Sequence, residues 1–156
     1  MTFYHYTVGD PMREIWSEKL IRRGKRTVEG PRWERPAVWL STNPLWEATV
    51  WKNVSRPADC QDSLRKAGRA GGAFRIAIDT QYLDVLPWER WRREGRESPC
   101  VVKTMEDDSY GTGANPREQF AVFSSIPEKH WIQVEYYGGK QWEPLDAEDM
   151  DYLLQV

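Results

Sequence analysis

Cysteine and histidine are scarce in this sequence, and this limits the chemistry that it can support. Its 156 residues include two cysteines, Cys60 and Cys100, and two histidines, His5 and His130. The cysteines form no Cys-x-x-Cys spacing, so we expect no disulfide framework, no zinc site and no other metal centre. A Ser-His-Asp or Cys-His centre would have to recruit a histidine from a distant strand, which disfavours nucleophilic hydrolysis.

Long apolar runs are missing as well. The apolar stretches are short, such as residues 37–40, whereas a helix that crosses a bilayer needs about 20 residues. The first ten residues have no basic region followed by an apolar run, the pattern of a secretory signal. We therefore expect a cytoplasmic protein with no membrane segment, folded as one domain over residues 1–156. The sequence does not indicate its oligomeric state.

Three widespread nucleotide and metal motifs are also absent. The chain has no Gly-x-x-x-x-Gly-Lys, no Gly-x-Gly-x-x-Gly and no His-Glu-x-x-His. These absences argue against a phosphate-binding loop, a doubly wound dinucleotide-binding domain and a zinc peptidase.

Tryptophan is abundant, with nine residues, and charge is unevenly divided. Residues 1–78 carry 14 Lys or Arg against 8 Asp or Glu, while residues 79–156 carry 8 against 16. The tryptophans could fill the core, stack on nucleic-acid bases or face a partner protein. The charge division fits either a basic face that attracts an anionic ligand or a mixed, solvated surface.

Hydrophobic periodicity and turn residues predict an α+β fold with mainly antiparallel strands. Strands are expected at residues 2–7, 37–41, 73–78, 82–86, 119–124, 131–137 and 141–143. Helices are expected from Pro11, with Asp10 as cap, to a stop at Gly24, then at residues 44–52, 58–68, 87–94 and 147–154, the last capped by Asp146. Residues 25–36 and 104–116 lack a period and are expected to be loops.

Three segments, FYHYT at residues 3–7, VWLSTNPLWEAT at 38–49 and REQFAVFSSIP at 117–127, follow one another in a suggestive order. That order resembles the ADP-ribosyltransferase superfamily, most closely its DarT-like nucleic-acid-modifying toxins and its RNA 2′-phosphotransferases. The resemblance implies a single domain with a mainly antiparallel split sheet and short flanking helices. It further implies NAD as substrate and transfer of ADP-ribose to a nucleic acid or a protein.

The first motif of that family binds the nicotinamide ribose and the nicotinamide region of NAD, which implies a pocket with His5, Tyr6 and Thr7. A neutral imidazole offers one donor and one acceptor, as a hydroxyl ligand requires. A histidine that is buried and satisfied within a strand fits the same pattern. Basic residues that follow the first predicted helix, among them Arg22, could hold the pyrophosphate or a nucleic-acid backbone, or only favour the helix macrodipole.

The second motif of the family supports the nicotinamide ribose, and here Ser41 and Thr42 occupy it. Trp39 or Trp46 would then offer a stacking surface nearby. Capping of a following helix is an equally simple role for the Ser-Thr pair.

The third motif departs from the family. Its members use a glutamate that binds the ribose 2′-hydroxyl and stabilises the positive charge that develops as nicotinamide leaves. The family pattern puts Gln119 at this position, and a carboxamide carries no charge. Glu118 could serve only in a register shifted by one residue, which would turn it to the other face of the strand. Another carboxylate such as Glu47 could contribute instead.

Three functions follow from these alternatives. The first is an NAD-dependent, toxin-like ADP-ribosyltransferase. The second is the same fold weakened by Gln119 and acting as a nucleotide-binding or nucleic-acid-binding module. The third is a small inhibitor that binds a partner protein through exposed tryptophans and an acidic tail, since tryptophan and arginine are enriched at interface hot spots.

Overall fold

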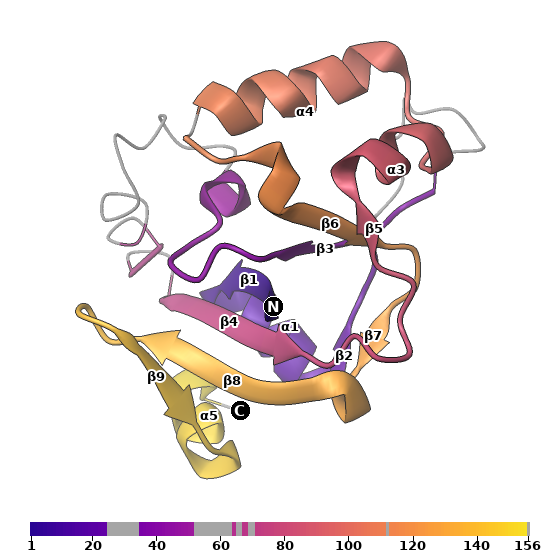
Figure 1. The fold of residues 1–156 in the computed structure, drawn as a ribbon. Helices are drawn as coiled ribbons and strands as arrows, with labels where there is room; N and C mark the ends of the chain where they lie inside the picture. Colours follow the sequence, from indigo (N-terminus) through magenta and orange to yellow (C-terminus); the bar gives the residue numbers. More distant parts are fainter. Residues whose placement is uncertain (25–34, 52–63, 65–66, 69–70, 112, 156) are drawn as a thin grey trace.

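A seven-stranded sheet with helices at both of its ends forms the protein (Figure 1). The computed structural model describes residues 1–24, 35–51, 64, 67–68, 71–111 and 113–155. The strand order is β5-β6-β3-β1-β4-β8-β9, every pairing is antiparallel, and β2 and β7 form a separate short ladder. The α+β class predicted from the sequence is therefore confirmed.

The strands are β1 (Phe3–Val8), β2 (Leu20–Ile21), β3 (Val38–Ser41), β4 (Ala73–Ile78), β5 (Leu86–Pro87), β6 (Gln119–Val122), β7 (Ile126–Pro127), β8 (Trp131–Tyr137) and β9 (Trp142–Leu145). The α-helices are α1 (Gly9–Glu18), α3 (Trp88–Glu94), α4 (Pro99–Gly111) and α5 (Ala147–Leu154). Short 3-10 helices are η1 (Ala48–Trp51), η2 (Pro116–Glu118) and η3 (Glu128–His130). None of the helices in the described residues is long and apolar enough to cross a membrane.

The sheet is nearly divided between β1 and β3. These strands share the single register pair Tyr4↔Ser41. By contrast, β1 pairs with β4 from Phe3 to Val8, and β3 pairs with β6 along its whole length. Two longer ladders therefore diverge from one joint.

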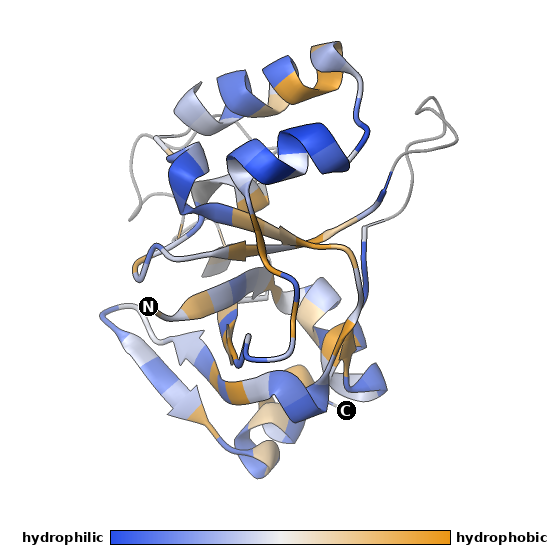
Figure 2. Ribbon diagram, turned by 45° about the vertical axis from the view of Figure 1, so that its right-hand side comes forward, coloured by the Kyte–Doolittle hydropathy of each residue, from blue (hydrophilic) through white to orange (hydrophobic). Residues whose placement is uncertain are grey.

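Two hydrophobic cores pack against the sheet, and the larger one contains residues from both sides of this joint. The larger one packs α1 and α5 against the sheet and contains Met12, Phe74 and Ile76, all at most 1% exposed. A second core lies under α3 and α4 and contains Leu86, Trp88 and Trp91. Figure 2 shows the hydrophobic residues gathered on the strands, while α3 presents a strongly hydrophilic ribbon. Trp88 and Trp91 belong to α3 and are buried, so neither offers the base-stacking surface that the sequence allowed.

The first helix differs from its prediction at both ends. Asp10 lies inside the first turn rather than capping it, because Val8 is the N-cap residue and makes no side-chain cap bond. The helix ends at Glu18 rather than at Gly24, because Lys19 turns into the left-handed region (φ 53°) and its N–H donates to Ile15 O. The next two residues are then free to pair with β7.

Three further predictions differ from the structure. Residues 99–111 form the helix α4 where a polar loop was expected from residue 104. The helix expected at residues 44–52 is replaced by a turn and the 3-10 helix η1, because Ser41 and Asn43 accept hydrogen bonds from backbone N–H groups two residues ahead. The strand expected at residues 82–86 shrinks to β5. Most of the helix expected at residues 58–68 and of the loop at 25–36 lies outside the described residues.

Candidate functional site

A cavity of about 500 Å³ opens where β1 and β3 diverge. Its walls come from β1, β3, the η1 segment, α4 and the start of β6. The polar residues that line it are Tyr4, His5, Tyr6, Ser41, Glu47, Thr49, Asp108, Ser109 and Gln119. Its size falls within the range of small-molecule sites, roughly 300–1,000 Å³. The three sequence motifs thus meet around one hollow.

His5 lies on β1 at the wall of this cavity. Its Nδ1 is 3.0 Å from the carbonyl oxygen of Trp39 on β3, and a carbonyl only accepts, so Nδ1 carries the proton. Burial lowers the pKa of His5 below its ordinary value, and the bond to Trp39 opposes that shift only in part. The imidazole is therefore neutral near pH 7, and its Nε2 has a lone pair available to accept a ligand hydroxyl.

The lowered pKa makes folding sensitive to pH. In the unfolded chain a histidine titrates near pH 6.5. Below that pH the unfolded chain therefore binds a proton at position 5 that the folded protein, with its lower His5 pKa, does not yet bind. The contribution of His5 to stability is complete above about pH 6.5 and declines as the pH falls toward the folded pKa.

His5→Asn keeps an N–H donor for Trp39 O but cannot titrate. In urea unfolding at about pH 7.5 and about pH 5.5, we expect the wild type to lose more unfolding free energy than His5→Asn. Equal losses in the two proteins would contradict the neutral, buried imidazole.

Gln119 and Glu47 form the polar floor of the cavity. The Gln119 Nε2 donates to Glu47 Oε1 at 3.0 Å, and both residues are buried. The same Oε1 also accepts from the backbone N–H of Thr49 at 3.2 Å and from its hydroxyl at 2.7 Å. Within the described residues the other oxygen, Oε2, makes no hydrogen bond. A carboxylate held firmly by one oxygen thus keeps a second oxygen for a ligand.

The second motif has a mixed outcome. Ser41 lines the cavity, and its hydroxyl also accepts from Asn43 N–H at 3.1 Å, which shapes the turn that replaces the expected helix. Thr42 is outside the cavity lining, and its N–H donates to Glu118 O at 2.9 Å. Trp46 is buried against the rings of Tyr6 and Trp142, while Trp39 is the tryptophan that lines the cavity.

The remaining predicted site residues separate into two groups. Tyr6 lines the cavity and donates its hydroxyl to Asn43 O, whereas Thr7 is buried but takes no part in the lining. Glu118 lies outside the cavity and accepts from the Asn43 side chain at 3.1 Å, so the shifted register is not adopted. Arg22 is exposed and ion-paired with Glu18, and it too is outside the lining.

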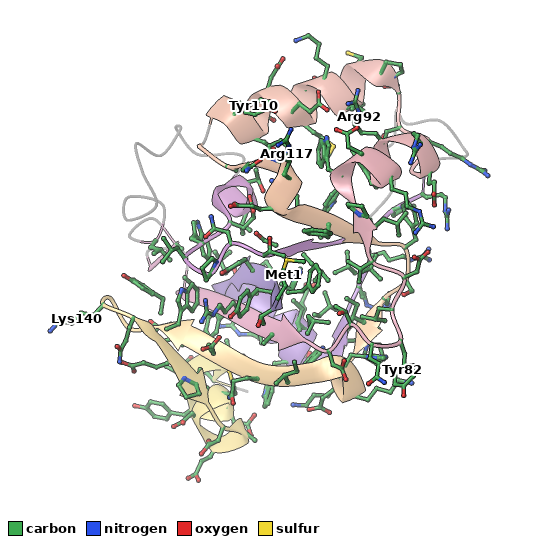
Figure 3. The ribbon with its side chains drawn as sticks, in the orientation of Figure 1. Met1, Tyr82, Arg92, Tyr110, Arg117 and Lys140 are labelled. Carbon is green, nitrogen blue, oxygen red and sulfur yellow. The ribbon has the colours of Figure 1, made fainter. Side chains whose placement is uncertain are left out.

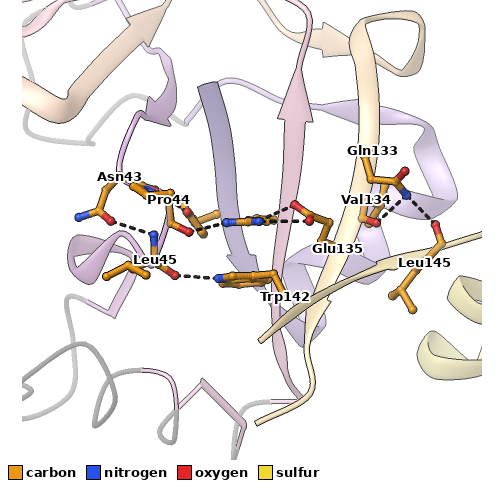
Figure 4. Close-up of polar contacts among 10 residues, drawn as sticks. Asn43, Pro44, Leu45, Gln133, Val134, Glu135, Trp142 and Leu145 are labelled. Atoms are coloured by element: carbon orange, nitrogen blue, oxygen red, sulfur yellow. Dashed lines mark hydrogen bonds and ion pairs between the residues drawn. The ribbon is translucent and has the colours of Figure 1, made fainter. Parts of the chain in front are cut away.

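A buried arginine ties the two parts of the sheet together beside the cavity. Arg75 of β4 binds Glu135 of β8 with two hydrogen bonds, at 2.5 and 3.1 Å, and donates to Pro44 O at 2.6 Å. Figure 4 shows Glu135 and Pro44 at the two ends of this chain of contacts, with Leu45 O accepting from Trp142 below them. The turn after β3 is thereby anchored to the β4–β8 ladder.

Sequence reasoning missed the contribution of α4. Asp108 and Ser109 of this helix line the cavity, and Ser109 Oγ lies 3.4 Å from Gln119 Nε2. The helical spacing of Val102, Met105 and Ser109 was the available signal, but a serine in the third position concealed it. No group of His, Cys, Asp and Glu in the described part of the chain could hold a metal ion.

Comparison of the chain with protein-family models, with curated proteins and with solved structures found no match.

Proposed function

We propose that the protein binds NAD in this cavity and transfers its ADP-ribose group to a macromolecule, a nucleic acid or a protein. The observation that carries the proposal is that His5, Ser41 and Gln119, from three separate motifs, share one cavity with the buried carboxylate of Glu47. This proposal keeps the ADP-ribosyltransferase-like assignment of the fold.

The proposed chemistry gives each of these residues one task. When the bond between ribose C1′ and nicotinamide breaks, the electron pair leaves with nicotinamide and positive charge develops on the sugar. Glu47 Oε2 stabilises that charge, because a fixed carboxylate in a water-poor cleft interacts strongly with a nearby positive charge. The same oxygen accepts a hydrogen bond from a ribose hydroxyl. Gln119 positions Glu47 through Oε1, and His5 Nε2 accepts a second hydroxyl. An oxygen or nitrogen of the acceptor then bonds to C1′ and releases its proton.

The charge of the cavity favours the cationic half of NAD. Glu47 and Asp108 are acidic, and no Lys or Arg occurs among the described residues of the lining. Two carboxylates suit the positively charged nicotinamide ring and the cationic transition state. They do not suit the pyrophosphate, which therefore extends toward the mouth of the cavity.

The direct test uses purified protein and NAD labelled in its adenylate part, with nucleic acids or cell extract as acceptors. Nicotinamide release with transfer of label supports the proposal. Calorimetric binding of NAD without nicotinamide release would identify a binding module, the function that the uncharged Gln119 favours. If neither binding nor release occurs, the proposal fails, and a search for a stoichiometric partner protein becomes the next step.

Gln119→Glu separates the enzyme from the binding module. In the proposed enzyme the new carboxylate would lie beside Glu47, and repulsion between like charges would raise the pKa of the pair until the two share a proton. We expect nicotinamide release at pH 7 to fall roughly ten-fold, with the loss reduced at higher pH. A gain in NAD cleavage would instead mean that position 119 is where the family carboxylate belongs and that the natural protein is weakened.

A further inference from the structure

Four exposed arginines from three segments of the chain lie near the end of β6 that is remote from the cavity, and two of them contact Phe123. They are Arg23, Arg35, Arg93 and Arg96. The Arg23 Nη1 donates to Phe123 O at 3.3 Å, and the Arg35 guanidinium lies 4.0 Å from the centre of the Phe123 ring. The Arg35 backbone N–H also donates to Gly95 O at 3.1 Å, which brings the end of α3 to the same place.

No carboxylate within the described residues forms an ion pair with any of these four arginines. The two described acidic residues that follow Arg93 and Arg96 in the sequence are ion-paired elsewhere or partly buried. Glu94 pairs with Arg90 at 2.7 Å, and Glu97 has one carboxylate oxygen fully buried. By comparison, Arg92 on the same helix is held by Glu89 and Glu106. Within the described residues these four arginines therefore carry positive charges that no ion pair balances.

We propose that this arginine surface, defined by residues 23, 35, 93 and 96, binds the phosphate backbone of a nucleic acid. Arginine presents a planar fork that grips phosphate oxygens with two hydrogen bonds, and all four cations here are arginines. The tryptophans beneath α3 are buried, so backbone contacts rather than base stacking supply the affinity. Binding is accordingly independent of sequence and sensitive to salt.

The surface stands apart from the chemistry proposed for the cavity, yet β6 links the two. Gln119 begins this strand in the cavity, and Phe123 follows its last residue at the arginine surface. At about 3.3 Å per residue the two positions are roughly 13 Å apart. A nucleic-acid strand bound by the arginines would pass close to the cavity, so the acceptor of the proposed transfer would be a nucleic acid.

The test measures fluorescence anisotropy of labelled oligonucleotides of about 20 nucleotides, as single-stranded DNA, single-stranded RNA and duplex DNA, between about 50 and 200 mM salt. The variant Arg93→Gln/Arg96→Gln removes the two arginines that make no contact with Phe123. We expect the affinity at the lower salt concentration to drop roughly five- to ten-fold. The slope of log affinity against log salt concentration should also show about one fewer counterion released for each arginine removed.

Lys129→Gln/Lys140→Gln removes the same charge elsewhere and is the matched control. Figure 3 places Lys140 at the tip of the β8–β9 hairpin, well away from α3. Tight binding by the control and weak binding by the arginine variant support the proposal, whichever nucleic acid binds. It is overturned if neither protein differs from the wild type, if no oligonucleotide binds, or if polyglutamate of matched charge competes as well as nucleic acid. NAD cleavage need not occur for any of these results, so the two proposals fail separately.

Discussion

Replacement of Glu47 by glutamine is expected to reduce nicotinamide release from NAD by a factor of roughly 10²–10³. The variant keeps the side-chain volume and an oxygen that can accept from Thr49 and Gln119, so the polar floor of the cavity survives. It loses the negative charge that is proposed to face the ribose. Loss of one fixed electrostatic group in a water-poor site costs about 3–4 kcal/mol of transition-state stabilisation.

The matched control is Glu118→Gln. Glu118 is the glutamate that the shifted register would have used, and it lies outside the cavity with its Oε2 bonded to Asn43. We expect this variant to retain at least about half of the wild-type rate, because Glu118 takes no part in the cavity lining and contacts Asn43 instead. Equal losses in the two variants, or full activity of Glu47→Gln, would show that Glu47 is not the stabilising carboxylate. Thermal melting of both variants confirms that they fold.

A second large effect is expected from Arg75→Met, which should lower the free energy of unfolding by about 3–5 kcal/mol. The substitution leaves the carboxylate of Glu135 with no counterion where only 16% of its side chain is exposed. It also removes the donor to Pro44 O and the guanidinium that lies 4.3 Å from the centre of the Tyr4 ring. An uncompensated buried charge costs more than the ion pair itself contributes.

The double variant Arg75→Met/Glu135→Met tests that explanation. With both charges gone, the penalty for the orphaned carboxylate disappears, and we expect unfolding in urea to recover to within about 2 kcal/mol of the wild type. If the double variant is as unstable as the single one, the cost lies in the lost contacts to Pro44 and Tyr4 rather than in the charge of Glu135.

Elements governed by local patterns could be predicted from the sequence. The alternation of apolar residues predicted β4 and β8 with the bounds that the structure shows. Asp146 caps α5 by accepting a hydrogen bond from Asp149 N–H, as expected. The helix α4 escaped prediction because only Val102 and Ser109 are buried on it, so its apolar stripe is too thin to display a period. An exposed pair, Lys103 with Asp107, supports it from the solvent side.

The candidate site could be predicted only in part for a related reason. His5, Ser41 and Gln119 lie within strands, and strand alternation gives them a defined face. Glu47 was one of several possible carboxylates, because its role depends on a turn that was predicted as helix. Its contact with Gln119 joins residues 72 positions apart and requires the β3–β6 register that sets Ser41 opposite Gln119. No local pattern encodes such a register.

The single pair Tyr4↔Ser41 has a consequence for how the molecule responds to an occupant. Main-chain pairing across this seam is sparse, so side-chain contacts such as those of Arg75 with Pro44 O and of His5 with Trp39 O hold the two ladders together. A small molecule bound in the cavity would contact residues of both ladders and would add to the interactions that hold them together. Binding of this molecule to the folded state would raise the free energy of unfolding of the domain. A rise in melting temperature with ligand concentration would therefore report occupancy even when no reaction follows.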